Sequence, residues 1–120
     1  MKQSAEELEL VKKYAEMPLL LDVIEEDKKR IGESSAILKR ELRFYLSALQ
    51  DRVTADIYEL KKALKEHDIK IIEQKRTEDN LFISYSIRGY QYKMNPLMSK
   101  VRTDGMLILA QQMNVIVEEE

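Results

Sequence analysis

The side chains able to perform acid–base, nucleophilic or metal chemistry are few in this sequence, and they do not cluster along it. His67 is the single histidine, and there is no cysteine. A metal site or histidine-based catalysis needs further ligands or a nucleophile, and the sequence around His67 carries no motif that supplies them. His67 follows a long helical segment, where a cation interacts favourably with the helix dipole, so a capping role accounts for it.

The carboxylates and hydroxyls that do lie close together also lack a catalytic arrangement. The acidic run Glu25–Asp27 precedes the basic run Lys28–Arg30. Consecutive carboxylates point in different directions around a helix, whereas acid–base pairs must converge in one cleft. Ser34 and Ser35 have no nucleophile-elbow glycines around them, which favours capping. The sequence therefore predicts no enzyme activity, no catalytic residue, no cofactor and no metal.

Composition bounds the class of protein. The chain has 120 residues, of which 44% are hydrophobic and 35% charged, enough apolar surface for one folded domain spanning residues 1–120. Three glycines exclude a Gly-rich phosphate loop, and the lack of cysteine excludes a disulfide scaffold. The net charge of −2 argues against whole-surface attraction to nucleic acid or membrane, although a local patch remains possible. With no signal-peptide pattern, we expect a cytoplasmic protein without a membrane partner.

Two helices are expected at the N-terminus, over residues 4–16 and 18–31. Ser4 and Glu7 have the spacing of a capping box at the first helix start. Pro18 lacks a backbone donor and restricts the residue before it, so the pattern predicts a break there and a second helix starting at Pro18. Gly32 is the expected end of that helix.

The longest periodic segment predicts one amphipathic helix over residues 35–66, capped by Ser34 or Ser35. Its apolar residues recur at steps of three and four: Leu38, Leu42, Tyr45, Leu49, Val53, Ile57, Leu60 and Leu64. This spacing is typical of a coiled-coil seam with one extra four-residue step. The alternative is two helices with a break between Asp51 and Thr54.

The hydrophobic period changes to two after His67, which predicts an antiparallel hairpin over residues 68–94. The alternation shifts phase at Gly89, and either a bulge or a tight Arg88–Gly89 turn that makes three strands explains the shift. Asn95 followed by Pro96 then signals a C-terminal helix over 96–113. The expected fold is α+β and mainly helical, with the order ααα-ββ(β)-α and one long amphipathic helix.

The long helix also predicts the assembly. Thirty-two residues at about 1.5 Å each exceed the diameter of a compact domain of this size, so the helix would extend past its own domain with an apolar stripe uncovered. A second copy would cover it. We therefore expect a non-catalytic protein-interaction or regulatory module that acts as a homodimer. The expected interface residues are Leu42, Tyr45, Leu49, Val53 and Ile57.

A nucleic-acid-binding regulator is the alternative function. Half of the eight aromatic residues lie between Phe82 and Tyr92, accompanied by basic residues, as in platforms that stack bases. The same aromatics equally suit a half-buried sheet. The element order also resembles that of winged-helix regulators, in which Thr54–Glu66 would be the DNA-reading helix. The expected contacts are Lys61, Lys65, Lys75, Arg76, Arg88, Tyr90, Tyr92 and Lys93.

Overall fold

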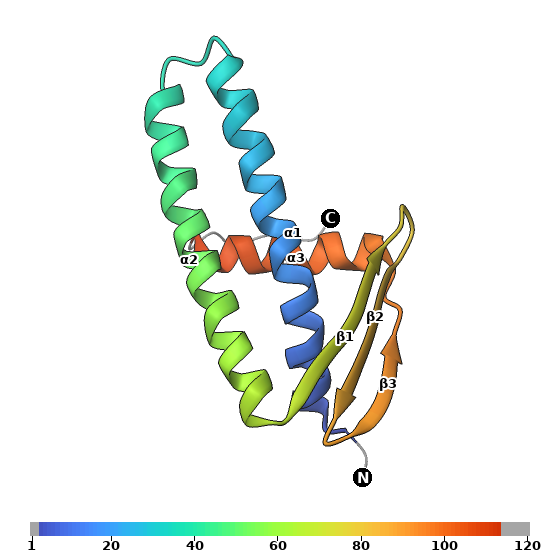
Figure 1. The fold of residues 1–120 in the computed structure, drawn as a ribbon. Helices are drawn as coiled ribbons and strands as arrows, with labels where there is room; N and C mark the ends of the chain where they lie inside the picture. Colours follow the sequence, from blue (N-terminus) through green and yellow to red (C-terminus); the bar gives the residue numbers. More distant parts are fainter. Residues whose placement is uncertain (1–2, 114–120) are drawn as a thin grey trace.

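The computed structural model describes residues 3–113, which form three helices and one three-stranded sheet. In chain order the elements are α1 (Ala5–Glu33), α2 (Lys39–Glu66), β1 (Ile69–Arg76), β2 (Leu81–Ile87), β3 (Tyr90–Met94) and α3 (Met98–Gln112) (Figure 1). The predicted class, α+β and mainly helical, is confirmed. The number of helices before the sheet is two rather than the predicted three.

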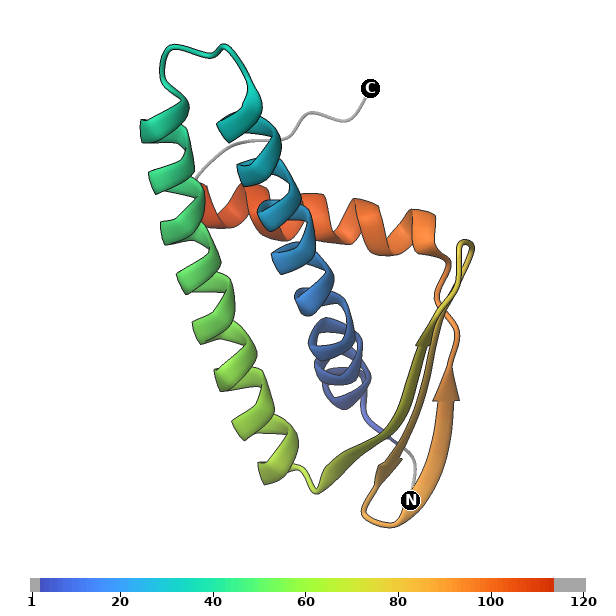
Figure 2. The same cartoon turned by 45° about the horizontal axis from the view of Figure 1, so that its top comes forward.

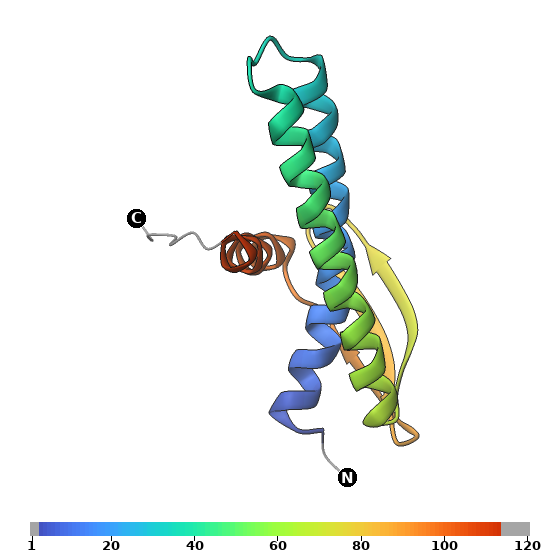
Figure 3. The ribbon, with the colours of Figure 1, turned by 90° about the vertical axis from the view of Figure 1, so that its left-hand side faces the viewer.

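The predicted break at Pro18 is wrong, because α1 runs through it. Pro18 forfeits one backbone hydrogen bond and clashes with the preceding turn, which bends a helix rather than ending it when packing holds both halves. Figure 3 shows α1 bending along its length. Met17, Leu20 and Ile24 are buried in one cluster on both sides of the proline, so tertiary packing outweighs the local cost. Gly32 lies in the last turn instead of ending the helix.

The long helix is continuous, as favoured, but it begins at Lys39 rather than at residue 35. The predicted cap Ser34 instead ends α1, where its hydroxyl donates to the Ile31 carbonyl at 2.6 Å. The start of α2 has no side-chain cap. Residues 51–54 lie inside the helix, so the alternative with a break there is wrong.

The sheet is an antiparallel meander in the order β1-β2-β3. Between β2 and β3 the turn is tight, with positive φ at both Arg88 (51°) and Gly89 (87°). Positive φ at two successive turn residues matches the twist of hairpin strands, and it resolves the two alternatives in favour of the turn. A register irregularity does occur, but in β1 between Ile71 and Glu73.

The last helix starts two residues later than predicted, at Met98 instead of Pro96. Leu97 forms an isolated antiparallel bridge with Asn80, and the Leu81 N–H donates to the Pro96 carbonyl at 3.0 Å. These contacts hold residues 96–97 in an extended conformation beside the start of β2. The sequence signal at Asn95–Pro96 therefore marks this extended link, and the helix follows it.

The helices α1 and α2 form an antiparallel pair that sets the long axis of the molecule, whose extents are 56 × 28 × 27 Å. The sheet packs beside the N-terminal part of α1, and α3 crosses the pair on the other side (Figures 2 and 3). One core cluster joins Val11 and Leu64 to buried strand residues such as Tyr85. A second joins Leu20 to Leu49 and Val53. α3 packs against both clusters, so it closes one side of the helix pair.

Candidate ligand-binding groove

A large apolar groove lies where α3 crosses α1, and we call it the α1–α3 groove. Its volume is about 820 Å³, within the range of small-molecule sites. α1, the β1–β2 turn and α3 line it. Its walls include Leu19, Leu20, Val101, Met106, Leu109 and Met113. Met106 is 59% exposed, so part of this apolar wall faces solvent. Methionine side chains adapt their shape to what they contact, which suits a binding surface.

Gly105 lies where α3 passes close to the Leu20 side chain of α1. A Cβ at Gly105 would lie 2.7 Å from Leu20 Cδ2, so a larger residue here would require that terminal methyl group to shift. The ends of α3 are tied separately. The Met98 N–H donates to the Asp79 carbonyl at 2.8 Å, and Arg52 Nη1 donates to the Gln112 carbonyl at 2.7 Å. The groove is therefore bounded by a helix fixed at three points.

Among the charged residues that line this mainly apolar groove, Glu16 is almost completely buried, whereas Asp22, Arg76, Glu78 and Arg102 are exposed. Glu16 on α1 is 2% exposed, and its Oε1 accepts no hydrogen bond from residues 3–113. Lys12 Nζ is 4.0 Å from Glu16 Oε1 but only 2.7 Å from Asp104 Oδ2 on α3. Asp104 thus holds the cation that would otherwise approach Glu16. Glu16 is left with acceptor capacity that a ligand can use.

The surroundings make Glu16 a weaker acid than an ordinary glutamate. Burial raises the pKa of Glu16 to about 7, opposed by the positive charge of Lys12 and reinforced by the negative charges of Asp104 and Glu9. Lys12 pairs with Asp104, and this pairing raises the pKa of the Lys12 ammonium. At neutral pH Glu16 therefore exchanges readily between a carboxyl that donates and a carboxylate that only accepts.

A second buried carboxylate, Glu7, lies near the start of α1 and is fully partnered. Arg88 Nη1 and Nη2 donate to its two oxygens at 2.7 and 3.2 Å, and the Ser4 N–H donates at 3.0 Å. His67 Nδ1 lies 3.2 Å from Glu7 Oε2. These contacts, led by Arg88, lower the pKa of Glu7 to about 2. The cluster joins α1, the end of α2 and the β2–β3 turn, and its satisfied groups indicate a structural clamp.

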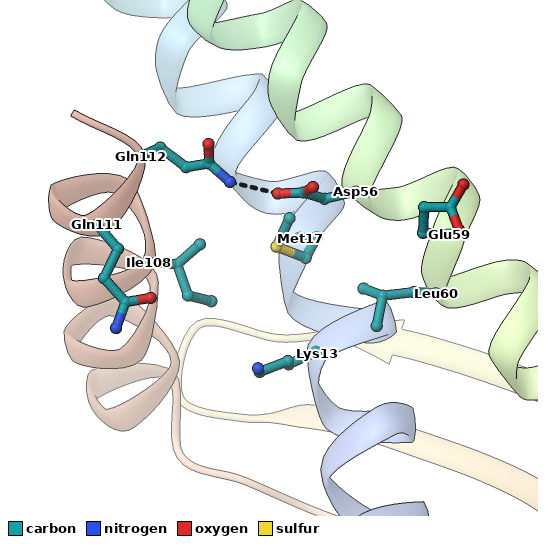
Figure 4. A pocket seen from close by; sticks show the side chains of 8 residues that line it. All are labelled: Lys13, Met17, Asp56, Glu59, Leu60, Ile108, Gln111 and Gln112. Atoms are coloured by element: carbon teal, nitrogen blue, oxygen red, sulfur yellow. Dashed lines mark hydrogen bonds between the residues drawn. The ribbon is translucent and has the colours of Figure 1, made fainter. Parts of the chain in front are cut away.

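A smaller and more polar cavity of about 310 Å³ lies between α1, α2 and the C-terminal half of α3 (Figure 4). The Gln112 side-chain amide donates to Asp56 Oδ2 across it. Lys13 and Met17 of α1 lie on the wall formed by that helix. Its hydrogen bond between Gln112 and Asp56 joins the end of α3 to α2.

The predicted homodimer residues divide into two groups. Leu49 is 2% exposed and Val53 is 0% exposed, because both pack against Leu20 and Ile24 of α1. Ile57 also packs against this cluster. The reason given for a dimer, an uncovered stripe on the long helix, is therefore wrong for this half: α1 covers it. Leu42 and Tyr45 remain 42% and 39% exposed.

The predicted nucleic-acid contacts do not form one surface. The partners Tyr85↔Tyr92 and Ile87↔Tyr90 put both tyrosines on the core-facing side of the sheet, and Tyr92 stacks on Tyr85 at 5.7 Å. Lys75 and Lys93 pair with Phe82 and Ser84 on the opposite face. The remaining contacts are separated: Arg88 binds Glu7, Arg76 lies 3.7 Å from Asp22, and Lys61 and Lys65 are exposed on α2. Thr54–Glu66 is part of α2 and not a separate reading helix.

Sequence reasoning missed the groove and its carboxylate. One signal was present: Glu16 precedes Leu20 and Ile24 by four and eight residues, so it lies on an apolar row of the helix. A charged residue on such a row is unusual enough to mark a site. Asp104 and Gly105 gave no comparable signal, because their role depends on where α3 crosses α1.

Fold and groove together define a small α+β protein with a helix pair, a three-stranded meander and a crossing C-terminal helix. A family model described as YhjD protein matches residues 2–116, so the chain belongs to the YhjD protein family. No curated protein and no solved structure matches it. Within residues 3–113 no helix is both long and apolar enough to cross a membrane. The same residues hold no group of three side chains suited to a metal ion.

Proposed function

We propose that this chain is a non-catalytic regulatory module that binds an apolar ligand with a cationic head group in the α1–α3 groove. The observation that carries the proposal is Glu16, a 2%-exposed carboxyl without a hydrogen-bond donor to Oε1 among the described residues. It lies on the wall of a mainly apolar groove whose other charged lining residues are exposed. A mainly apolar cavity with a few polar groups that fix the orientation of the ligand is the usual form of a small-molecule site.

The chemistry of Glu16 selects the head group. An ammonium group placed at Oε1 would satisfy the vacant acceptor and stabilise the carboxylate that burial disfavours. A carboxylate ligand would instead add a third negative charge beside Glu16 and Asp104. Because the pKa of Glu16 is about 7, binding of an amine should strengthen as pH rises through 7 and Glu16 ionises.

The test compares three ligands with the same alkyl chain: decylamine, decanol and decanoate, titrated by calorimetry at pH 6 and pH 8. We expect decylamine to bind about tenfold more tightly than decanol at pH 8, as for one hydrogen bond to a charged group. Decanoate should bind most weakly. At pH 6 the preference for the amine should shrink.

Two variants separate the head-group contact from the apolar wall. Glu16→Gln should remove the preference for decylamine and leave decanol binding unchanged. Met106→Gln should weaken both ligands. Glu26→Gln, at an exposed glutamate of the same helix, is the matched control and should change neither. The proposal fails if neither ligand binds saturably, or if Glu16→Gln keeps the amine preference.

We also propose that the module acts as a homodimer, now supported only by the part of the predicted interface that the chain leaves exposed. Leu42 and Tyr45 keep 42% and 39% of their surface accessible near the start of α2. Light scattering at tens of micromolar measures the mass directly. A dimer that Leu42→Glu dissociates supports the proposal, whereas a monomeric wild-type chain contradicts it.

A further inference from the structure

A second feature lies at one end of the long axis, where residues 28–45 form the end of α1, the connection and the start of α2; we call this segment the tip. It lies opposite the end that holds the α2–β1 connection and the β2–β3 turn (Figure 1). Ile37 is 96% exposed, Phe44 76% and Leu38 60%. Apolar side chains gathered on a protruding end mark an interaction surface.

The tip is also strongly basic in a chain that is acidic overall. It contains Lys28, Lys29, Arg30, Lys39, Arg40 and Arg43 but only two acidic residues, Glu33 and Glu41, a net charge of +4. Since the whole chain carries −2, the remainder carries −6. The whole-chain balance, which predicts no attraction to a membrane, therefore hides a local excess of positive charge in the tip, next to the acidic run Glu25–Asp27.

Several of these cations converge on one depression. Lys28, Lys39, Arg40 and Arg43 line a cavity of about 350 Å³ together with Phe44 and Ser47, and none of these residues is acidic. Lys28 Nζ donates to Gln50 Oε1 at 2.9 Å and lies 3.7 Å from Glu25 Oε2, which fixes its side chain between α1 and α2. Four cations around a cavity of this kind are suited to an anionic head group, and Phe44 adjoins it with an apolar ring.

We infer that the tip docks on an anionic phospholipid surface, with the Ile37, Leu38 and Phe44 side chains entering the acyl boundary and the cations holding the head groups. Apolar residues at the apex with Lys and Arg behind them are the pattern of interfacial membrane binding. Each Lys or Arg near such a surface adds attraction. A nucleic acid would use the cations but would leave Ile37, at the apex, in water.

The experiment is cosedimentation of the full chain with vesicles of phosphatidylcholine, alone or mixed with phosphatidylglycerol. We expect partitioning onto the mixed vesicles at least tenfold above that onto phosphatidylcholine alone, and a decrease as salt increases. Ile37→Ser combined with Phe44→Ser should reduce partitioning about tenfold or more, because the inserted apolar area is lost. Both residues are exposed, so the fold should be retained; circular dichroism and melting check this.

The cations are tested with matched triple variants. Lys39→Gln, Arg40→Gln and Arg43→Gln together should weaken partitioning on the order of 100-fold at low salt. Lys61→Gln, Lys65→Gln and Lys70→Gln remove the same charge from exposed positions outside the tip and should change partitioning little.

Three results would overturn the inference. The first is equal partitioning onto both vesicle types, and the second is an equal loss in the two triple variants. The third is that a short oligonucleotide binds the chain in the absence of vesicles and displaces it from vesicles when they are present. In that case Ile37→Ser and Phe44→Ser would not change the binding of the oligonucleotide. The last result would assign the cations to nucleic acid. None of these outcomes depends on the α1–α3 groove, which lies outside the tip. The proposed dimer residues Leu42 and Tyr45 lie within the tip, and light scattering without vesicles tests that dimer separately.

Discussion

Two buried glutamates on the same helix behave in opposite ways. Glu7 and Glu16 lie nine residues apart on α1 and are 3% and 2% exposed. The Glu7 carboxylate is contacted by Arg88, a backbone N–H and His67, and these contacts lower its pKa to about 2. Glu16 has a lysine 4.0 Å away that pairs with another carboxylate, and its pKa rises to about 7. Burial alone therefore does not decide what a carboxylate does.

The two glutamates differ in the number of hydrogen-bond donors that the tertiary structure places beside each carboxylate. Glu7 faces the place where α1, the end of α2 and the β2–β3 turn meet, and each supplies a partner. Glu16 faces the crossing of α1 and α3, where Lys12 is already engaged. A buried charge with all its partners holds elements together, whereas one without them remains available for a ligand. This contrast separates the clamp from the candidate site.

The largest expected effect comes from removing Arg88. Arg88→Ala leaves Glu7 buried without its two strongest hydrogen bonds, so we expect the melting temperature at pH 7 to fall by on the order of 10 °C. Arg76→Ala is the matched control, because Arg76 forms an exposed pair with Asp22 at 3.7 Å and should change the melting temperature by little. Equal falls in both variants would show that Glu7 is not clamped.

The acid side of the stability curve should follow Glu7. Its folded pKa lies below the ordinary value of 4.5, so its contribution is present above pH 4.5 and is lost as pH falls toward 2. In Arg88→Ala this loss should be shallower, because the pKa of Glu7 moves back up. Melting temperatures measured from pH 7 down to pH 2 test this slope.

The next effect concerns Glu16, for which the dependence of stability on pH has the opposite sign to that of Glu7. Because its folded pKa of about 7 exceeds the ordinary 4.5, stability should decrease as pH rises from 4.5 to 7. Glu16→Gln removes the ionising group, so the decrease should disappear and the variant should be more stable at pH 8, by about 1 kcal/mol after allowing for solvent screening. Urea unfolding across this pH range measures both; Glu26→Gln, which should keep the decrease, is the control. A variant less stable than wild type at pH 8 would contradict the comparison.

The fold was predictable where local signals agree with packing. The Ser4–Glu7 capping box, the α2 period and the turn at Gly89 all act within a few residues, and all appear in the structure. Pro18 was misleading because its local cost is outweighed by the packing of Met17 and Leu20 on either side of it. The expected exposure of Leu49 and Val53 is wrong for the same reason, since a continuous α1 is long enough to cover them.

The candidate site was less predictable, because it depends on one long-range contact. At Gly105 α3 passes close to α1, with Leu20 as the contacting residue. That contact brings Asp104 beside Lys12, and Lys12 pairs with Asp104 rather than with Glu16. The clamp shows the same limitation: Arg88 and Glu7 are 81 residues apart in the sequence. Charge partners at such distances follow from topology and not from spacing.

The smallest and most specific effect tests the competition for Lys12. Asp104→Asn removes the carboxylate that holds Lys12 at 2.7 Å and that repels Glu16, so both changes should lower the pKa of Glu16 below 7. Lys12→Gln should do the opposite and raise it, because the only attraction from α1 itself is lost. Carbon-13 NMR titration of the glutamate carboxyls measures both, with the pKa of Glu7 expected to stay near 2 as an internal control. Asp22→Asn, at an exposed aspartate of α1, should leave Glu16 unchanged. If Asp104→Asn and Lys12→Gln shift Glu16 in the same direction, the lysine is not shared between the two carboxylates, and the availability of Glu16 needs another cause.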